Sequence, residues 1–250
     1  MDSLHLGLYL TAPHRCGYLE GKTAATLFVE PAQPLDSEIY GQLLARGFRR
    51  SGSHVYRPHC TECALCLSAR IPVADFKRAR SMRRIWNRNS AIQVKGMPQD
   101  YYEHHYWLYT RYMAHRHPDG PMADPSPDEY WTFLTAHWSD TIFYEFWMDG
   151  RLVMVAVTDV VPTGLSSVYT FFDPTLTRHS LGSFGILWQI EEARRRELEW
   201  VYLGYWIPNC DKMRYKKRFQ PLEIYQNRTW TLMTDPNDFA IDSNASDSVV

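Results

Sequence analysis

Three neighbouring segments with strand character constrain this chain more than any other part of its sequence. Residues 143–148 and 151–160 are rich in aromatic and β-branched side chains, and only Asp149 and Gly150 separate them. Asp-Gly between two such runs predicts a β-hairpin closed by a two-residue turn. Residues 165–172 predict a third strand. The chain is therefore expected to contain an antiparallel meander.

The sequence around this meander predicts helices that flank a sheet. Residues 181–199 carry apolar side chains near one helical face, and residues 200–203 predict a fourth strand. Ser126, Pro127 and Glu129 form the start signal of a helix that is expected to run to Trp138. Further strands are expected at residues 27–30, 70–73, 222–225 and 229–233, and further helices at 37–47, 79–89 and 100–115. Helices interleaved with strands indicate a mixed α/β fold.

A basic segment stands out on a chain whose net charge is only −1. The cationic side chains between residues 77 and 88 are Lys77, Arg78, Arg80, Arg83, Arg84 and Arg88. On the helix expected there, several of these arginines lie near one another, which suits the phosphates of a nucleic acid. Guanidinium groups also suit a substrate carboxylate, and charged helix faces are often simply solvated. The sequence leaves these three interpretations open.

The N-terminal sequence and the cysteine content favour a cytoplasmic protein. Residues 1–10 show no cationic start followed by a long apolar run, so no signal peptide is expected. No apolar run reaches the length of about eighteen residues that a membrane helix needs, so no membrane partner is expected. The chain has five cysteines, an odd number, which is more typical of a reducing compartment than of a disulfide scaffold.

Three closely spaced cysteines predict a soft-metal site. Cys60, Cys63 and Cys66 are separated by two residues each, which lets several thiolates converge on one ion, and Cys16 is a fourth candidate ligand. Four thiolates suit Zn²⁺ or an iron–sulfur cluster. The alternative is a group of buried, inert thiols. Cys210 is expected to be unrelated to this cluster.

Residues 56–76, which contain the cysteine cluster, resemble the aminoacyl-tRNA–protein transferases. The pattern continues through Arg80-Ser-Met-Arg83-Arg84 to Asn89. Further matching segments are residues 16–18, 111–112, 116–122, 202–208, 213–216 and 219–223. The resemblance extends over about residues 5–234, and the triple cysteine looks like the bacterial branch of the family. Leu19 stands where the longer eukaryotic relatives carry a cysteine, which removes one candidate thiol.

This resemblance implies both an activity and a fold. The bacterial branch moves leucine from leucyl-tRNA onto the N-terminal Asp or Glu of proteins, which marks them for degradation. The implied partners are leucyl-tRNA and proteins with an acidic N-terminal residue. The ester of the charged tRNA drives the transfer, so no cofactor is implied. The implied fold is a GNAT-like acyltransferase, with a mixed sheet flanked by helices and an irregular Cys-containing N-terminal region.

The resemblance and the side-chain chemistry together suggest site residues of four kinds. Groups that would orient the amine or donate to the ester are Tyr202, Tyr205, Tyr215 and Asp173. Cations for the acceptor's acidic residue are Arg80, Arg83 and Arg84, with Lys212 and Arg214 as a second group. Apolar side chains for the donated leucine are Tyr169, Phe171, Phe172 and Trp206. The candidate metal ligands are Cys16, Cys60, Cys63 and Cys66.

The expected domain organisation follows the same division of chemistry. It comprises a Cys-cluster and basic region at 1–90, a GNAT-like transferase region at 91–236 and an acidic disordered tail at 237–250. Three alternatives stay open. The first is that the donor is arginyl-tRNA. The second is a non-catalytic zinc-knuckle RNA-binding module, and the third is a GNAT enzyme that uses acetyl-CoA.

Overall fold

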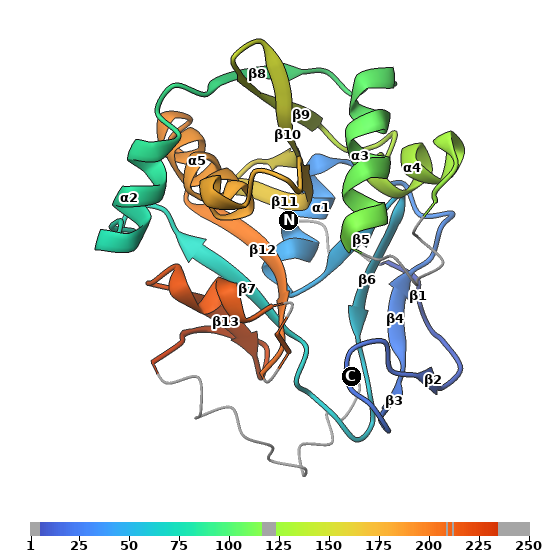
Figure 1. Ribbon diagram of the computed structural model, residues 1–250. Helices are drawn as coiled ribbons and strands as arrows, with labels where there is room; N and C mark the ends of the chain where they lie inside the picture. The colour runs from blue at the N-terminus through green and yellow to red at the C-terminus, as the bar shows by residue number, and fades with distance from the viewer. Residues whose placement is uncertain (1–5, 117–123, 209, 212, 235–250) are drawn as a thin grey trace.

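An eight-stranded mixed sheet forms the centre of the computed structural model, which describes residues 6–116, 124–208, 210–211 and 213–234 (Figure 1). The strand order is β14-β13-β7-β12-β11-β10-β9-β8. The expected meander is confirmed as β9 (Thr141–Met148), β10 (Arg151–Val161) and β11 (Gly164–Phe172), paired antiparallel. Asp149 and Gly150 have φ angles of 50° and 73°, which the tight hairpin turn requires. The predicted tail at 237–250 and Lys212 lie outside the described residues.

One crossover makes the sheet mixed. Helix α5 (Leu181–Arg195) connects β11 to β12 (Trp200–Trp206), and these two strands pair in parallel. A short 3₁₀ turn, η1 (Thr177–His179), precedes the helix. The helix ends before residue 199 because the N–H of Leu198 turns back to the carbonyl of Ala193. β12 extends beyond residue 203 because its second half pairs with β7 (Leu67–Pro72).

The other half of the sheet combines strands from both ends of the sequence. β7 lies between β12 and β13 (Glu223–Gln226) and is antiparallel to both, and β14 (Thr229–Leu232) forms that edge. β8 (Gln93–Met97) forms the opposite edge and was not expected from the sequence. Its side chains are largely exposed and include Lys95, so the strand lacks an apolar alternation. β7 comes from residues 1–90, yet it pairs inside a sheet built mainly from later residues.

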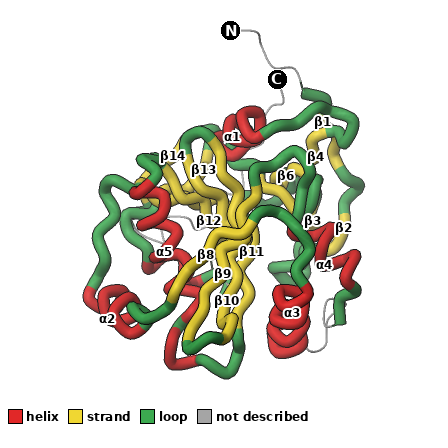
Figure 2. The backbone as a smooth tube through the Cα atoms, turned by 90° about the horizontal axis from the view of Figure 1, so that it is seen from above, coloured by secondary structure: helices red, strands yellow, loops and turns green. Residues whose placement is uncertain are grey.

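Helices cover both faces of this sheet (Figure 2). α2 (Arg80–Arg88) and α5 pack on one face, and α3 (Glu103–Arg116) and α4 (Pro127–Leu134) pack on the other. The capping box of α4 is confirmed, because the Ser126 hydroxyl accepts from the Glu129 N–H and the Glu129 carboxylate accepts from the Ser126 N–H. α4 ends at Leu134 and not at Trp138, since the next residue is extended. No described helix is long and apolar enough to cross a membrane.

The N-terminal region is more regular than its sequence indicated. β1 (Leu8–Leu10), β4 (Thr26–Val29), β6 (His54–Pro58) and β5 (Arg49–Ser51) form a second sheet in that order, and α1 (Ser37–Ala45) follows β4 along the chain. β2 (His14–Arg15) and β3 (Thr23–Ala24) form a short separate ribbon. β4 was expected at residues 27–30 and is confirmed. The other strands were missed because most of them are short, and β1 and β2 are exposed along their whole length. A third apolar cluster joins this region to the main sheet through Tyr40, Val161 and Tyr202.

A buried ion pair fixes β5 against β10. Nε and one terminal nitrogen of Arg50 donate to the two carboxylate oxygens of Asp159 at 2.6 and 2.7 Å, and neither side chain is exposed. Thr141 donates to the same carboxylate at 2.7 Å, and Arg50 also donates to the carbonyl of Gly52. Such a pair offsets its desolvation only when its hydrogen-bonding groups are well satisfied, as they are here.

We predict that Asp159→Ala destabilises the protein by about 3–5 kcal/mol, because it leaves Arg50 charged, buried and unpaired. Urea denaturation of the variant and the wild type measures the difference. Glu191→Ala is the control, since Glu191 bridges Arg78 and Arg194 at the surface and should contribute under about 1 kcal/mol. Equal losses in both variants would contradict the structural role of the buried pair.

Candidate functional site

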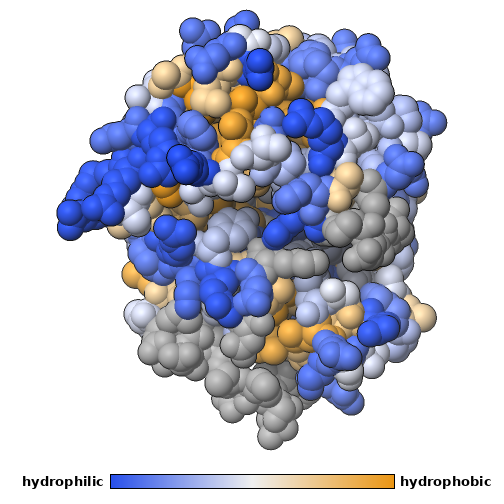
Figure 3. Space-filling model, viewed as in Figure 1, coloured by the Kyte–Doolittle hydropathy of each residue, from blue (hydrophilic) through white to orange (hydrophobic). Residues whose placement is uncertain are grey.

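The parallel strands β11 and β12 separate and leave an opening in the sheet. They pair only over Gly164–Ser166 and Trp200–Tyr202, after which β12 stays with β7 and β11 stays with β10. A bulge interrupts the pairing of β12 with β7 between Tyr202 and Gly204. Gly204 has a φ of +77° and is partly exposed, although Leu203 and Tyr205 on either side are buried. The face shown in Figure 3 is hollowed across its middle, in the part of the view where β12 lies in Figure 1.

A buried lysine borders this opening. Lys216 lies in the 3₁₀ turn η2 (Arg214–Arg218), and its Nζ donates to the main-chain carbonyl of Tyr205. The same Nζ lies 3.7 Å from the point where a Cβ on Gly204 would stand. Burial, and then the neighbouring Arg49 charge, lower the pKa of Lys216 to about 7, while the nearby Cys210 side chain opposes the shift. The lysine is therefore poised between its two protonation states near neutral pH.

A buried arginine lies near the same Cβ position of Gly204. Arg49 in β5 donates to the carbonyls of Phe48 and Ala69, both at 3.1 Å, and its Nε has no hydrogen-bond partner among the described residues. That Nε lies 4.0 Å from the Cβ position of Gly204. Burial lowers the pKa of Arg49. The groups that favour its charged form are tyrosines and not carboxylates: Tyr205, Tyr40, Tyr202 and Tyr56.

Tyrosines from three elements form a wall beside η2. Tyr215 in η2 and Tyr169 in β11 both lie near Tyr112 of α3, so two of the expected site residues meet there. The Tyr169 hydroxyl donates to the sulfur of Met113 at 3.4 Å. Burial, and then Tyr112, raise the pKa of Tyr215 to about 12. The Tyr215 side chain as a whole is 40% exposed. We call Tyr112, Tyr169 and Tyr215 the tyrosine wall.

Four of the expected residues serve other contacts in the fold. Tyr205 donates to the carbonyl of Tyr56 at 3.1 Å, and the ring of Tyr202 lies under the Arg49 guanidinium at 5.4 Å. Phe171 and Trp206 are buried in the apolar clusters on opposite faces of the sheet.

Asp173 follows β11 at the start of the turn that leads to α5. It accepts from Thr175, at 2.6 Å from the hydroxyl, and from Arg111 of α3 at 3.2 Å. Burial alone would raise the pKa of Asp173, but these hydrogen bonds hold it below its ordinary value. Its carboxylate is therefore ionised and already partnered.

The expected arginines of α2 are exposed. Arg80, Arg83 and Arg84 lie on a helix at one edge of the molecule (Figure 1), and Arg83 donates to the carbonyl of Arg78. Arg214 is also exposed and pairs with Asp211 at 2.5 Å. The structure does not bring the α2 arginines together with Tyr205 or Tyr215 by any contact among the described residues.

The cysteines gather near the opening without reaching metal-ligand spacing. Burial, and then the thiolates of Cys60, Cys63, Cys16 and Cys210, raise the pKa of Cys66 to about 12. Cys210 therefore belongs to the cluster, and the expectation that it is unrelated is wrong. Among the described residues, no three of these sulfur atoms lie within 4.8 Å of one another. The cluster as placed does not fit a bound ion, so no reaction step is derived through one.

A second group of ligand-type side chains lies elsewhere, on α3 and β9. Nε2 of His104 and Nε2 of His105 each lie 2.7 Å from the same oxygen of Glu145. Burial lowers the pKa of His105 to about 4, so its neutral ring donates to the carboxylate. Trp147 donates to the other oxygen of Glu145 at 2.9 Å. Hydrogen bonding accounts for this arrangement without a metal.

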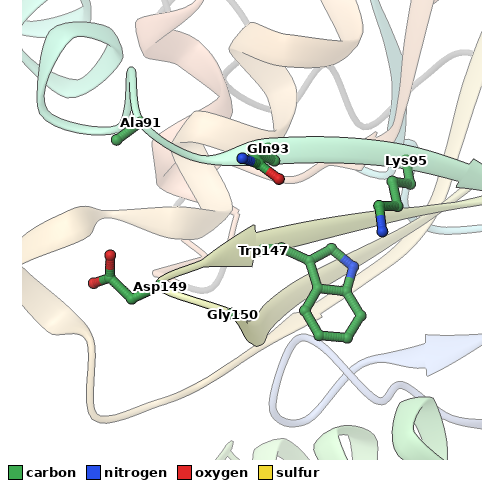
Figure 4. Close-up of a pocket in the computed structure, with 6 residues that line it drawn as sticks. All are labelled: Ala91, Gln93, Lys95, Trp147, Asp149 and Gly150. Atoms are coloured by element: carbon green, nitrogen blue, oxygen red, sulfur yellow. The ribbon is translucent and has the colours of Figure 1, made fainter.

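The pocket of Figure 4 lies beside that group, at the β8 edge of the sheet. It is lined by Ala91, Gln93, Lys95, Trp147, Asp149 and Gly150. Lys95 lies over the Trp147 ring, 5.7 Å from its centre. None of the expected site residues lines this pocket, so the opening at Gly204 is the better candidate.

Comparison with known families decides the class of the protein. A family model described as "Arginine-tRNA-protein transferase, N terminus" matches residues 14–84, and one described as "Arginine-tRNA-protein transferase, C terminus" matches residues 104–226. The chain belongs to this family. The resemblance seen in the sequence is thereby confirmed. Arg49 lies in the first matched range of the arginine-tRNA-protein transferase family, and Gly204 and Lys216 lie in the second.

Individual relatives in this transferase family match nearly end to end. A protein of Pseudomonas aeruginosa (strain LESB58) named "Aspartate/glutamate leucyltransferase" is 50% identical over 92% of this chain and 97% of its own length. A protein of the same name from Stutzerimonas stutzeri (strain A1501) is 49% identical over 94% of this chain and 100% of its own. The solved structure of L-PGS from Bacillus licheniformis aligns with a TM-score of 0.42 and 10% identity, over 56% of this chain and 45% of that chain.

We predict that Lys216→Met removes a pH dependence from the stability of this transferase. Below about pH 7 the lysine is protonated in both the folded and the unfolded state, so the buried charge lowers the free energy of unfolding by its full amount. Between about pH 7 and pH 10 only the unfolded state keeps the proton, so wild-type stability rises by up to about 1.4 kcal/mol per pH unit relative to the variant. Urea denaturation at pH 6.5, 7.5 and 8.5 measures this difference. The control Lys217→Met, at an exposed neighbour, should give a curve parallel to the wild type.

Proposed function

We propose that this protein is an aminoacyltransferase that moves leucine from leucyl-tRNA onto the N-terminal Asp or Glu of other proteins, which marks them for degradation. The observation that carries the proposal is sequence similarity. About half of the aligned residues are identical, over nearly the whole length, to those of proteins named aspartate/glutamate leucyltransferase. The similarity includes every element of the candidate site. Charged tRNA as the donor puts the proposed reaction in the cytoplasm.

The proposed reaction is an acyl transfer that needs positioning more than it needs strong bases. The acceptor's α-amine attacks the ester carbonyl carbon, the amide bond forms, and the ester bond to the tRNA ribose breaks. The amine loses a proton and the ribose oxygen takes one up. An α-amine has a pKa of about 7.7–8.0, so a useful fraction is neutral at pH 7. Holding both substrates together lowers the barrier by about 7–11 kcal/mol.

A GNAT-like arrangement of the second half is part of the proposal. It is supported by a meander, the crossover helix α5 and a parallel pair of strands that separate to leave an opening. In this opening Tyr215 orients the ester, and Asp173 acts through Arg111. Tyr202 and Tyr205 hold the walls around Arg49. Tyr169 and Phe172, which are partly buried, contact the donated leucine, while Phe171 and Trp206 support them by packing.

The N-terminal region supplies the tRNA contacts and the cysteine cluster in this proposal. The exposed Arg80, Arg83 and Arg84 meet tRNA phosphates, and Lys212 and Arg214 in the second part of the chain are a further cationic group. The proposed division at residues 90 and 236 sets off the N-terminal region and the acidic tail, and Arg49 of the N-terminal region also borders the transfer site. Transfer itself uses no cofactor. Zinc or an iron–sulfur cluster on Cys16, Cys60, Cys63 and Cys66 stays a proposal, which metal analysis of anaerobically purified protein decides.

We predict transfer of labelled leucine from leucyl-tRNA to a peptide that starts with Asp, and little transfer from arginyl-tRNA or acetyl-CoA. The measurement is a single assay in which each donor is offered separately and the peptide product is identified by mass. Arginine in the product would identify arginyl-tRNA as the donor. An acetylated peptide would identify acetyl-CoA as the donor. Binding of tRNA without any transfer would favour the RNA-binding module.

We predict that replacing Arg80, Arg83 and Arg84 together by Ala raises the KM for leucyl-tRNA and leaves the kcat nearly unchanged. Each lost phosphate contact lowers the slope of log affinity against log salt by roughly 0.7–0.9. Measurements of tRNA affinity between about 50 and 200 mM salt test the expected change in slope, because such effects are large in this range. Unchanged tRNA affinity together with weaker use of Asp-starting peptides would assign these arginines to the acceptor instead.

A further inference from the structure

Two buried cations in this molecule lack an acidic partner. Among the described residues, the buried Lys and Arg side chains are Arg49, Arg50 and Lys216. Arg50 is neutralised by Asp159, but no carboxylate forms an ion pair with Arg49 or Lys216 within the described chain. A buried charge without a partner is strongly destabilising. Such a pair of charges is explained if a ligand supplies the missing anion.

Both unpaired cations border the same small space. Lys216 Nζ and Arg49 Nε lie 3.7 and 4.0 Å from the position of a Cβ on Gly204, and no other atom of the described residues, beyond the immediate chain neighbours, lies within 4 Å of it. The Arg49 Nε is a hydrogen-bond donor without an acceptor. Gly204 is partly exposed, so the space reaches solvent. A side chain on residue 204 would fill the gap that glycine leaves.

We propose that Arg49 and Lys216 bind the side-chain carboxylate of the acceptor's N-terminal Asp or Glu, which enters over Gly204. This assignment rests on the proposed function, since it names the residues that select the acceptor in that reaction. An anion at this point receives hydrogen bonds from the Arg49 Nε and the Lys216 ammonium together, and both charges are then compensated.

The surroundings favour a carboxylate of the acceptor over a phosphate of the tRNA. The two cations are buried and enclosed by tyrosines, which suits one small anion at the end of a short side chain. The exposed arginines of α2 offer the open surface that a polynucleotide backbone needs. Lys216 directly follows Tyr215 of the tyrosine wall, so an acidic side chain held at Gly204 keeps its own α-amine close to the proposed transfer site.

Kinetics with paired peptides test this assignment. Peptides that differ only in Asp or Asn at the first position are offered to the wild type, Lys216→Met and Arg49→Met, with leucyl-tRNA as donor. Each variant is expected to lose about 100-fold in kcat/KM for the Asp peptide and to change little for the Asn peptide. The KM for leucyl-tRNA should stay the same. Lys217→Met, at an exposed neighbour of Lys216 in η2, and Arg46→Gln, at the exposed residue that ends α1 three positions before Arg49, serve as controls.

The outcomes separate this inference from the proposed function. If the wild type transfers no leucine to any peptide, the proposed function fails. If the wild type transfers leucine but the variants keep its Asp-to-Asn preference, the assignment to Arg49 and Lys216 is overturned. Equal losses with both peptides would place the cations in the chemical step, and a raised KM for leucyl-tRNA alone would place a phosphate at Gly204.

A measurement on the wild type covers the case in which a variant does not fold. The charged groups that face Lys216 are Arg49 from β5 and the Cys210 thiol, and β12 contributes the Tyr205 carbonyl. Because the lysine loses its proton at about pH 7 when the site is empty, the Asp-to-Asn preference should fall between pH 7 and pH 9. The α-amine pKa of each peptide is measured separately, and the neutral fraction of each amine is divided out of the ratio. A preference that is constant with pH would reject Lys216 as a carboxylate ligand.

Discussion

The buried pair between Arg50 and Asp159 determines how the two parts of this protein meet. It ties β5 of the small sheet to β10 of the large one, and both carboxylate oxygens and all three guanidinium nitrogens are hydrogen-bonded. Adjacent residues of a strand point to opposite sides. Anchoring Arg50 therefore directs Arg49 toward β12, where it meets Tyr202 and Gly204. The position of the unpaired cation follows from that of the paired one.

The local elements were predictable because their signals are local. Asp149-Gly150 closes the hairpin, and Ser126 with Glu129 starts α4, as the sequence predicts. β8 and, apart from β4, the strands of the small sheet were not predictable in this way, because they are short or polar and acquire their pairing only from more distant residues. The same holds for β7, whose place between β12 and β13 depends on contacts far along the chain.

The site was predictable in kind but not in its residues. A search for clustered cations along the sequence finds the arginines of α2, which are exposed in the fold. Arg49 and Lys216 are far apart in sequence, and each lies in a segment that contains several other cations. Burial and the loss of an acidic partner distinguish them, and both are properties of the folded chain. Cys210 was missed for the same reason, since only folding brings it to Cys66.

Among the residues that the structure describes, no carboxylate neutralises Arg49 or Lys216, and this bears on how an acceptor is selected. An Asp or Glu side chain relieves the repulsion between Arg49 and Lys216 and satisfies the Arg49 Nε. A neutral Asn of nearly the same shape leaves both charges uncompensated in a buried site, so it is rejected by electrostatics and not by size. The stability that the empty site lacks becomes binding energy for the correct substrate. The same two buried cations around Gly204 therefore both destabilise the empty protein and select an acidic acceptor.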